Sequence, residues 1–191
     1  MTFTLSPLGM PARFGAFCRR FARDERGISV IEFAMLVPLL FTLYLGISEI
    51  SVFITADRKA TQVASAVGDL ASQSVELTND DITDIFDAAE VLVRPFDSST
   101  LTVIVSSIER DGNQFRVLWS EALNTASRGV GSTVALPDED LIPAGTGQTI
   151  ILSEVQYVHN SPLGNMFTDG LTVTDTFYLR PRRTLSVARV P

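Results

Sequence analysis

The sequence RRFARDERGISVIEFAMLVPLLFTLYLGISEI, residues 19–50, decides how this chain is organised. Inside it, an apolar run of 20 residues extends from Ile28 to Ile47 and contains a single charged residue, Glu32. A helix of that length spans about 30 Å, which is the hydrocarbon thickness of a typical bilayer. The stretch therefore predicts a membrane helix over residues 28–54, preceded by a basic leader over residues 1–27.

The charges of the chain are divided unevenly around this apolar run. Up to Gly27 there are five arginines and two acidic residues, whereas the rest of the chain holds 10 basic and 20 acidic residues, for a net charge of −7. Arginines close to one end of a membrane span hold that end in the cytoplasm. Four residues supply this orientation signal: Arg19, Arg20, Arg23 and Arg26. We expect a single-pass protein with a cytoplasmic N-terminus and an exported acidic domain.

Composition and missing motifs exclude several function classes. The exported part is acidic and the chain has one lysine, Lys59, so we expect no nucleic-acid binding. The single cysteine, Cys18, precedes the span, which leaves the exported part without an internal disulfide. No phosphate-loop, dinucleotide-binding, metal-ligand or nucleophile-elbow motif occurs, and we expect neither an enzyme nor a cofactor or metal site. His159, the one histidine, is more simply explained as a strand-end residue than as the base of an anchored hydrolase.

Beyond the span, the pattern predicts an α+β domain over residues 55–191, in which the membrane helix continues as an amphipathic helix packed on an antiparallel sheet. Its expected buried stripe is Ala60, Val63, Ala64, Val67, Leu70 and Ala71. A second helix is expected from about Asp80, where Thr78 and Asn79 can cap it, to Pro95. Its expected buried stripe is Ile82, Ile85, Phe86, Ala89 and Val93.

Four strands are expected after the helices. Residues 101–108 and 114–121 flank the turn Asp111-Gly112-Asn113 and predict a β-hairpin. Two further strands are expected within residues 148–159 and 171–180. Residues 124–147, rich in Gly, Ser, Thr and Pro, are interpreted as a long excursion from the sheet, either functional or merely mobile.

Two residues inside the span are unusual for a plain anchor. An acidic residue at mid-membrane costs about 2.5–3.5 kcal/mol, and less near the interface, where Glu32 lies. From position alone, Glu32 is either a snorkelling interfacial carboxylate or a group that meets a cation. Pro38 removes a backbone donor and is expected to kink the helix between Ala34 and Pro38.

The string RRFARDERGISVIEFAMLVPLLFTLYLGISE resembles type IV prepilins, and more narrowly the TadE-like minor pseudopilins of tight-adherence (Flp-type, type IVb) pilus systems. The shared pattern is an Arg-rich leader, a glycine, four residues, a glutamate, and an apolar run interrupted by proline. The segments ILSEVQYVHNSPLG (151–164) and LTVTDTFYLRPRR (171–183) are also similar to the C-terminal part of TadE-like proteins, where a Glu-x-x-Tyr strand, a proline turn and Arg-Pro-Arg recur.

This resemblance implies that a prepilin peptidase cuts between Gly27 and Ile28 on the cytoplasmic side. It also implies that Glu32 pairs with the terminal amine of a neighbouring subunit, which would relieve two membrane charges at once. The implied partners are the peptidase, other pilin or pseudopilin subunits, and the pilus assembly machinery of the inner (cytoplasmic) membrane. The C-terminal domain would then lie in the periplasm.

The prediction is therefore a minor pseudopilin, without enzymatic activity, that takes part in assembly of a Flp/Tad adhesive pilus. The alternative is an uncleaved single-span anchor that holds an exported binding or sensory domain. The two differ in whether the leader is retained.

Overall fold

The computed structural model describes residues 26–160 and 170–190, and the chain divides into two compact units between Ile47 and Ser48. Three arginines of the predicted orientation signal, Arg19, Arg20 and Arg23, lie outside the described residues. The fourth, Arg26, is the first residue of helix α2 (Arg26–Gln73).

The first unit consists, in its described part, of helix α2 up to Ile47. Its apolar side chains are exposed, Val30 to 67% and Met35 to 75%. This part of α2 is strongly apolar and none of it is buried, so the helix is long and apolar enough to cross a membrane. Among the described residues one helix meets these criteria, as expected for a single-pass membrane anchor.

Pro38 lies inside α2, and the helix continues beyond it. The hydroxyl of Thr42 donates a hydrogen bond to the Pro38 carbonyl oxygen at 2.9 Å. This is the usual bond of a helical threonine to the carbonyl four residues earlier, whereas the bond that Pro38 removes is the one to the Ala34 carbonyl. The predicted kink at this position stays a prediction.

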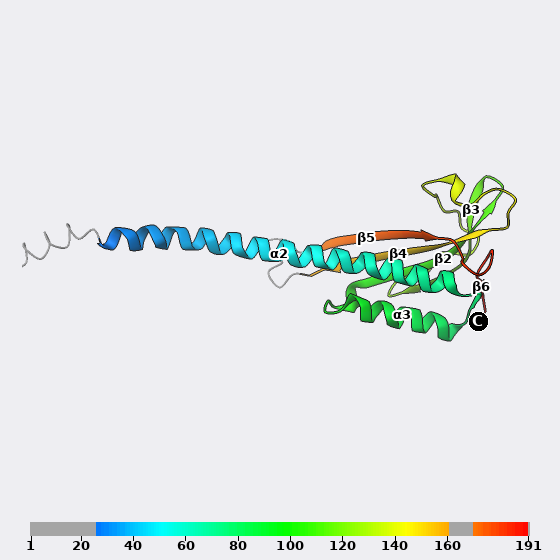
Figure 1. The fold of residues 1–191 in the computed structure, drawn as a ribbon, viewed down its shortest axis with the longest axis horizontal. Coiled ribbons are helices and arrows are strands. Elements are labelled where there is room, and N and C mark those ends of the chain that lie inside the picture. Colours follow the sequence, from blue (N-terminus) through cyan, green and yellow to red (C-terminus); the bar gives the residue numbers. More distant parts are fainter. Residues whose placement is uncertain (1–25, 161–169, 191) are drawn as a thin grey trace, which may run out of the picture. The chain divides into compact units, whose positions relative to one another are not determined.

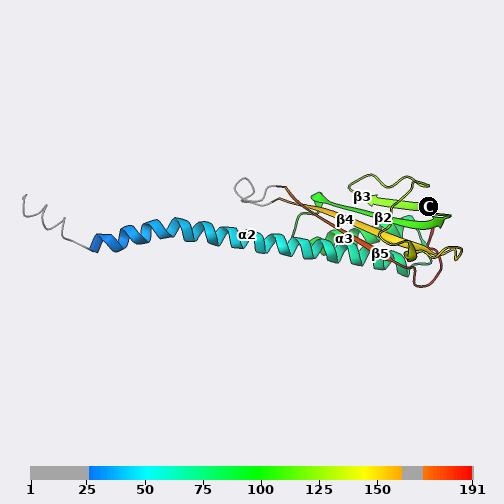
Figure 2. The same cartoon turned by 90° about the horizontal axis from the view of Figure 1, so that it is seen from above.

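In the second unit, the rest of α2 and helix α3 (Asn79–Val93) pack against one face of a four-stranded antiparallel sheet (Figures 1 and 2). The strands follow the order β3-β2-β4-β5 across the sheet. Their bounds are β2 Leu101–Asp111, β3 Gln114–Leu123, β4 Thr149–His159 and β5 Leu171–Leu179. The predicted α+β architecture, with a long helix on an antiparallel sheet, is confirmed.

The main core lies between the helices and the sheet. Five of the six residues predicted for the α2 stripe are buried, from Ala60 to Ala71. Leu70 is the exception: it is 41% exposed, because it lies at the edge of the stripe. Gly68 faces the sheet so closely that a Cβ there would lie 2.5 Å from Leu179 Cδ1 and 3.2 Å from Ser153 Cβ. Small residues on this part of α2 therefore allow close contact between helix and sheet.

Helix α3 begins at the predicted cap. Thr78 is its N-cap, and the Thr78 hydroxyl accepts a hydrogen bond from the Asp81 backbone while the Asp81 carboxylate accepts one from the Thr78 backbone. This reciprocal pair is a capping box, with aspartate in place of the usual glutamate. The side chains of Ile82, Ile85, Ala89 and Val93 are buried as predicted, and Phe86 is half-buried.

The hairpin of β2 and β3 turns through Gly112 and Asn113, with Asp111 paired to Gln114. Gly112 has a φ of 62°, a conformation that favours glycine. A β-bulge lies between Ser107 and Ile108. Such a bulge changes the face to which the following side chains point.

Residues 124–148 cover part of the other face of the sheet. Ile150 and Leu152 alternate along β4 with Ile151 of the main core, so they point to the opposite face. There they form a second apolar cluster together with Ile108, Phe115, Val117, Val134 and Ile142. The excursion is thus a packed cover of the sheet, with a short 3-10 helix, η2 (Glu139–Leu141), in its middle.

The C-terminal segment pairs with the connection between α2 and α3. A short parallel pair, β1 (Glu76–Leu77) and β6 (Ala188–Arg189), joins the α2–α3 connection to the chain end and was not predicted. Trp119 donates from Nε1 to the Val187 carbonyl at 2.8 Å, and Arg189 donates from Nε to Glu121 Oε1 at 2.8 Å. The C-terminus is therefore part of the fold rather than a tail.

Candidate functional site

The predicted processing site lies at the start of α2. Gly27 is the second residue of the helix, and Ile28 beside it is 53% exposed. A Cβ placed on Gly27 would meet no atom within 4 Å. No packing contact with the described residues therefore requires glycine here. The absence of a side chain can instead allow another protein to approach the backbone closely.

Glu32 is exposed on the same helix, five residues after Gly27. Five residues correspond to about 7.5 Å along a helix axis. The Glu32 carboxylate makes no hydrogen bond or ion pair with any of the described residues. Ile28 is one turn before Glu32, so the amine that cleavage would create lies on the same side of the helix as the carboxylate. The structure places Gly27, Ile28, Glu32 and Pro38 along one exposed helix, but brings no second charge to Glu32.

A second site of interest, which sequence reasoning missed, lies where the sheet begins to cover α2. Glu49 is 6% exposed and His159, the last residue of β4, is 3% exposed. Glu49 Oε1 and His159 Nε2 are 3.4 Å apart. The predicted strand-end histidine is thus buried against a carboxylate 110 residues away in the sequence.

The sequence did contain a signal for Glu49. Stepping back along α2 by three and four residues from the buried Ala60 gives Ala56, Phe53 and Glu49, which all share the sheet-facing side of the helix. The expected buried stripe begins only at Ala60, so it does not include Glu49.

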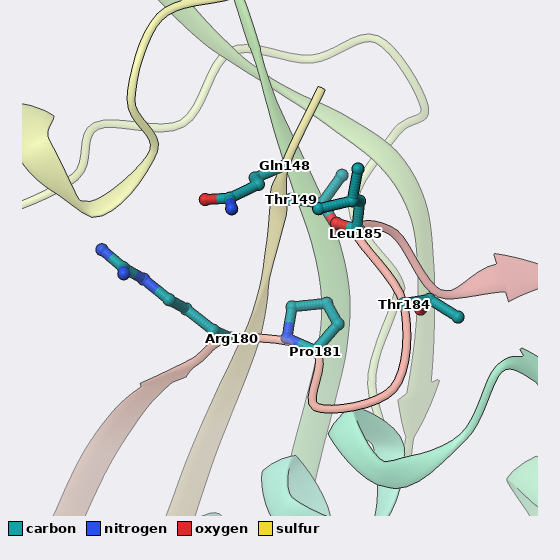
Figure 3. A pocket seen from close by; sticks show the side chains of 6 residues that line it. All are labelled: Gln148, Thr149, Arg180, Pro181, Thr184 and Leu185. Atoms are coloured by element: carbon teal, nitrogen blue, oxygen red, sulfur yellow. The ribbon is translucent and has the colours of Figure 1, made fainter. Parts of the chain in front are cut away.

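Two hollows of the second unit are lined by both polar and apolar side chains. The first, of about 120 Å³, is lined by Gln148, Thr149, Arg180, Pro181, Thr184 and Leu185. Figure 3 shows the polar ends of Gln148 and Arg180 on one side, away from Thr184 and Leu185. The Arg180 guanidinium already donates to the Leu141 carbonyl at 3.4 Å. The second hollow, of about 590 Å³, is an open groove between α2 and β5. Neither gathers a set of reactive side chains.

Within residues 26–160 and 170–190, no group of three or more His, Cys, Asp or Glu side chains is arranged to hold a metal ion. His159 has one carboxylate neighbour and two aromatic ones rather than a ligand set.

The similarity to known proteins lies in helix α2. Residues 27–69 match the family model described as TadE-like protein. The match begins at Gly27, includes Glu32, Pro38 and Glu49, and ends at Asp69 on α2. A search among curated proteins and a search among solved structures found no match. The resemblance found in the sequence is confirmed for the membrane helix and its extension.

Proposed function

Because residues 27–69 are TadE-like, we propose that this protein is a minor pseudopilin of a tight-adherence pilus system, matured by a prepilin peptidase and active in pilus assembly. The family match supports a role in the Tad pilus. The maturation step and the minor-subunit role are our proposal.

The observation that carries the proposal is the start of α2. A glycine without packing neighbours lies directly before an exposed Ile28, and a carboxylate without a partner among the described residues follows one turn later. A plain membrane anchor needs neither feature. A peptidase that must approach the backbone closely benefits from glycine, because glycine has no side chain. Removing residues 1–27 would also remove the basic leader.

The exposed apolar surface of the first unit supports assembly with other helices. Most of its side chains from Ile28 to Ile47 are exposed, and none of them is buried. In a membrane such a helix is compatible with lipid, and in a pilus-like array it is compatible with the helices of other subunits. Glu32 would meet a cation only in the second case, and the amine of Ile28 on a neighbouring subunit is the candidate cation.

The proposed topology has the leader in the cytoplasm and the second unit in the periplasm. It follows from the arginine excess before Gly27. A prepilin peptidase acting on the cytoplasmic side would then reach the Gly27–Ile28 bond.

Mapping of the N-terminus tests the proposal. Protein isolated from native membranes should begin at Ile28, and protein from cells without the peptidase should retain Met1. Gly27→Leu should also retain the leader, because the added side chain blocks close approach to the backbone. As a matched control, Gly46→Leu on the same helix should be processed normally, since Gly46 likewise has no neighbour within 4 Å. A retained leader in cells that contain the peptidase would instead support an uncleaved anchor with a binding or sensory domain.

A further inference from the structure

Strand β5 is the last strand on its side of the sheet, and no described strand pairs with its outer side. On the opposite side of the sheet the chain supplies its own neighbour, because Thr133 of the covering segment forms an antiparallel bridge with Arg116 of β3. β5 has one partner, β4, along its whole length. Its outer edge is therefore the place where another chain can meet a long row of backbone groups.

The backbone groups of alternate β5 residues point away from β4. The hydroxyl of Thr102 on β2 donates to the Gln156 carbonyl, so this β4 carbonyl points toward β2. Gln156 is paired on its other side with Thr174, whose backbone groups must then point outward, because the bonding side alternates along an antiparallel pair. The Thr176 amide agrees with this alternation, since it donates to the Asp175 carboxylate at 2.9 Å.

The outward amides of Thr172, Thr174 and Tyr178 have no hydrogen-bond partner among the described residues. Such groups recur every second residue, about 6.8 Å apart along a strand. An extended polypeptide presents donors and acceptors at the same spacing and can satisfy them by adding a strand to the sheet. The chemistry of this edge therefore favours an extended segment of another chain over a small molecule or a helix.

A groove beside this edge can receive the side chains of an added strand. The groove lies between α2 and β5, and its α2 wall includes Thr61, Gln62, Ser65 and Ala66 (Figure 1). An added strand would place every second side chain in the groove, because side chains alternate between the two faces of a sheet. This wall is uncharged and most of its side chains are small, so it fits short, uncharged side chains of the partner.

Asp175 gives the edge a charge that a partner can match. Its side chain shares the helix-side face of β5 with Phe177 and Leu179. The Asp175 carboxylate forms no ion pair with any of the described residues. A Lys or Arg side chain of an added strand could pair with this carboxylate and release the Thr176 amide to bond with that strand.

A second copy of this chain does not fit the edge in the antiparallel manner used throughout this sheet. β5 runs from Leu171, whose partner His159 contacts Glu49, to Leu179, which lies against Gly68. It therefore runs in the same direction as α2. Two antiparallel β5 strands would put the points at which the chain enters each second unit at opposite ends of the pair. Two anchors in one membrane need both entry points on the same side.

We propose that the β5 edge receives an extended strand of a different pilus subunit, which runs antiparallel to β5, places short uncharged side chains in the groove and sets a basic side chain against Asp175. The open edge itself is independent of the proposed function. The choice of partner rests on the proposed function, because other pilus subunits are the proteins that a pseudopilin meets during assembly.

Photo-crosslinking in cells that produce the pilus tests this proposal. The photoreactive amino acid p-benzoylphenylalanine, placed at the position of Gln62 in the groove wall, should form an adduct with another pilus subunit, identified from the crosslinked peptide by mass spectrometry. The same amino acid at the position of Asp87, exposed on α3, is the control and should not form that adduct. No adduct, an adduct with a second copy of this chain, or one with a protein outside the pilus would overturn the proposal.

A proline on the edge separates strand addition from mere proximity. Thr174→Pro, made in the crosslinking protein, removes an outward amide and leaves the bonds between β4 and β5 in place. The adduct yield should fall by about fivefold or more, whereas Thr174→Val, which keeps the amide, should leave it unchanged. Thr172→Pro, at the preceding outward position, takes its place if Thr174→Pro does not fold. An undiminished adduct in the folded proline variant would overturn the proposal.

Asp175→Lys tests the charge match. It should lower the adduct yield by about threefold or more, whereas Asp84→Lys, on the exposed side of α3, should not. An unchanged yield in Asp175→Lys would contradict a basic side chain at this place. N-terminal mapping of the same cells separates the two proposals. A retained leader contradicts the proposed maturation, whereas processed protein that forms no adduct contradicts the added strand alone.

Discussion

Arg128 forms two parallel hydrogen bonds with Glu154, from Nε to Oε2 at 2.8 Å and from Nη2 to Oε1 at 2.6 Å. Glu154 is on β4, and Arg128 is in the segment that covers the outer face of the sheet. The hydrogen bond to Glu154 raises the pKa of the Arg128 guanidinium above its ordinary value, against the opposing effect of burial. This half-buried pair therefore stabilises the packing of the covering segment on the sheet.

Arg128→Ala should lower the free energy of unfolding by about 1–2 kcal/mol, because it leaves a half-buried carboxylate without its partner. Arg58→Ala removes the same group from an exposed position on α2 and should change stability by less than about 0.5 kcal/mol. Chemical denaturation of the full-length protein in micelles measures both. Equal effects of the two substitutions would contradict the fastening role.

Gly68→Val should destabilise the second unit by about 1–3 kcal/mol, because the added atoms collide with Leu179 and Ser153. The same substitution in a Leu179→Ala background should cost less, since Leu179 Cδ1 is the nearest obstacle. The four stabilities of this double-mutant cycle provide the measurement. A cycle with no coupling would show that the close approach of helix and strand is not what requires glycine.

Two neighbouring serines on β2 should respond in opposite ways to alanine substitution. Ser107 Oγ is buried and has no hydrogen-bond partner among the described residues, so Ser107→Ala should leave stability unchanged or raise it by up to about 1 kcal/mol. Ser106 Oγ lies 2.8 Å from Ser120 Oγ, and Ser106→Ala should cost about 1 kcal/mol. Thermal unfolding of both variants distinguishes them, and a loss of stability in Ser107→Ala would indicate an unrecognised partner.

The capping box of α3 should make stability depend on pH at the acid end. The hydrogen bonds from the Thr78 hydroxyl and backbone lower the pKa of Asp81. Since the folded pKa lies below the unfolded one, the contribution is present above about pH 4 and is lost as pH falls through the folded value. The wild-type melting temperature should therefore fall more steeply between about pH 4 and about pH 2 than that of Asp81→Asn.

Asp84→Asn provides the control for this pH effect, because it removes one negative charge from α3 without touching the capping bonds. Its melting temperature should fall with pH as in the wild type. A wild-type profile parallel to that of Asp81→Asn would show that the cap does not carry the dependence.

Glu32→Gln should be processed at Gly27 but should reduce pilus assembly by about tenfold or more, since an unpaired terminal amine near the membrane costs more than about 1.4 kcal/mol. Met35→Gln introduces the same amide at another exposed position of α2 and should assemble more normally. Electron microscopy of pili and N-terminal mapping of the same cells give the two readouts. Normal pili in Glu32→Gln would remove the carboxylate from the assembly mechanism.

The helices and strands could be predicted from the sequence because their signals are local. Thr78 and Pro95 delimit α3, Gly112 and Asn113 mark the hairpin, and the alternation of Phe115 and Val117 marks a strand. The contacts that could not be predicted join distant residues. The pairing of β1 with β6 involves only two residues in each strand, and the burial of Glu49 depends on where β4 ends.

The bulge after Ser107 limited prediction in the same way. A strict alternation would assign Phe115, Val117 and Trp119 to one core, yet Trp119 belongs to the main core and the other two to the second cluster. A single extra residue in β3 causes the change, and no local signal in the sequence marks it.

The two edges of the sheet are unequal. Along β3, the Val117 amide donates to the Ser132 carbonyl and the Phe115 carbonyl accepts from the Val134 amide, so the covering segment occupies the first half of that edge. β5 is the terminal strand on the other side. A foreign strand is therefore added more readily beside β5 than beside β3. This asymmetry disfavours open-ended β-polymers, which need two equally open edges.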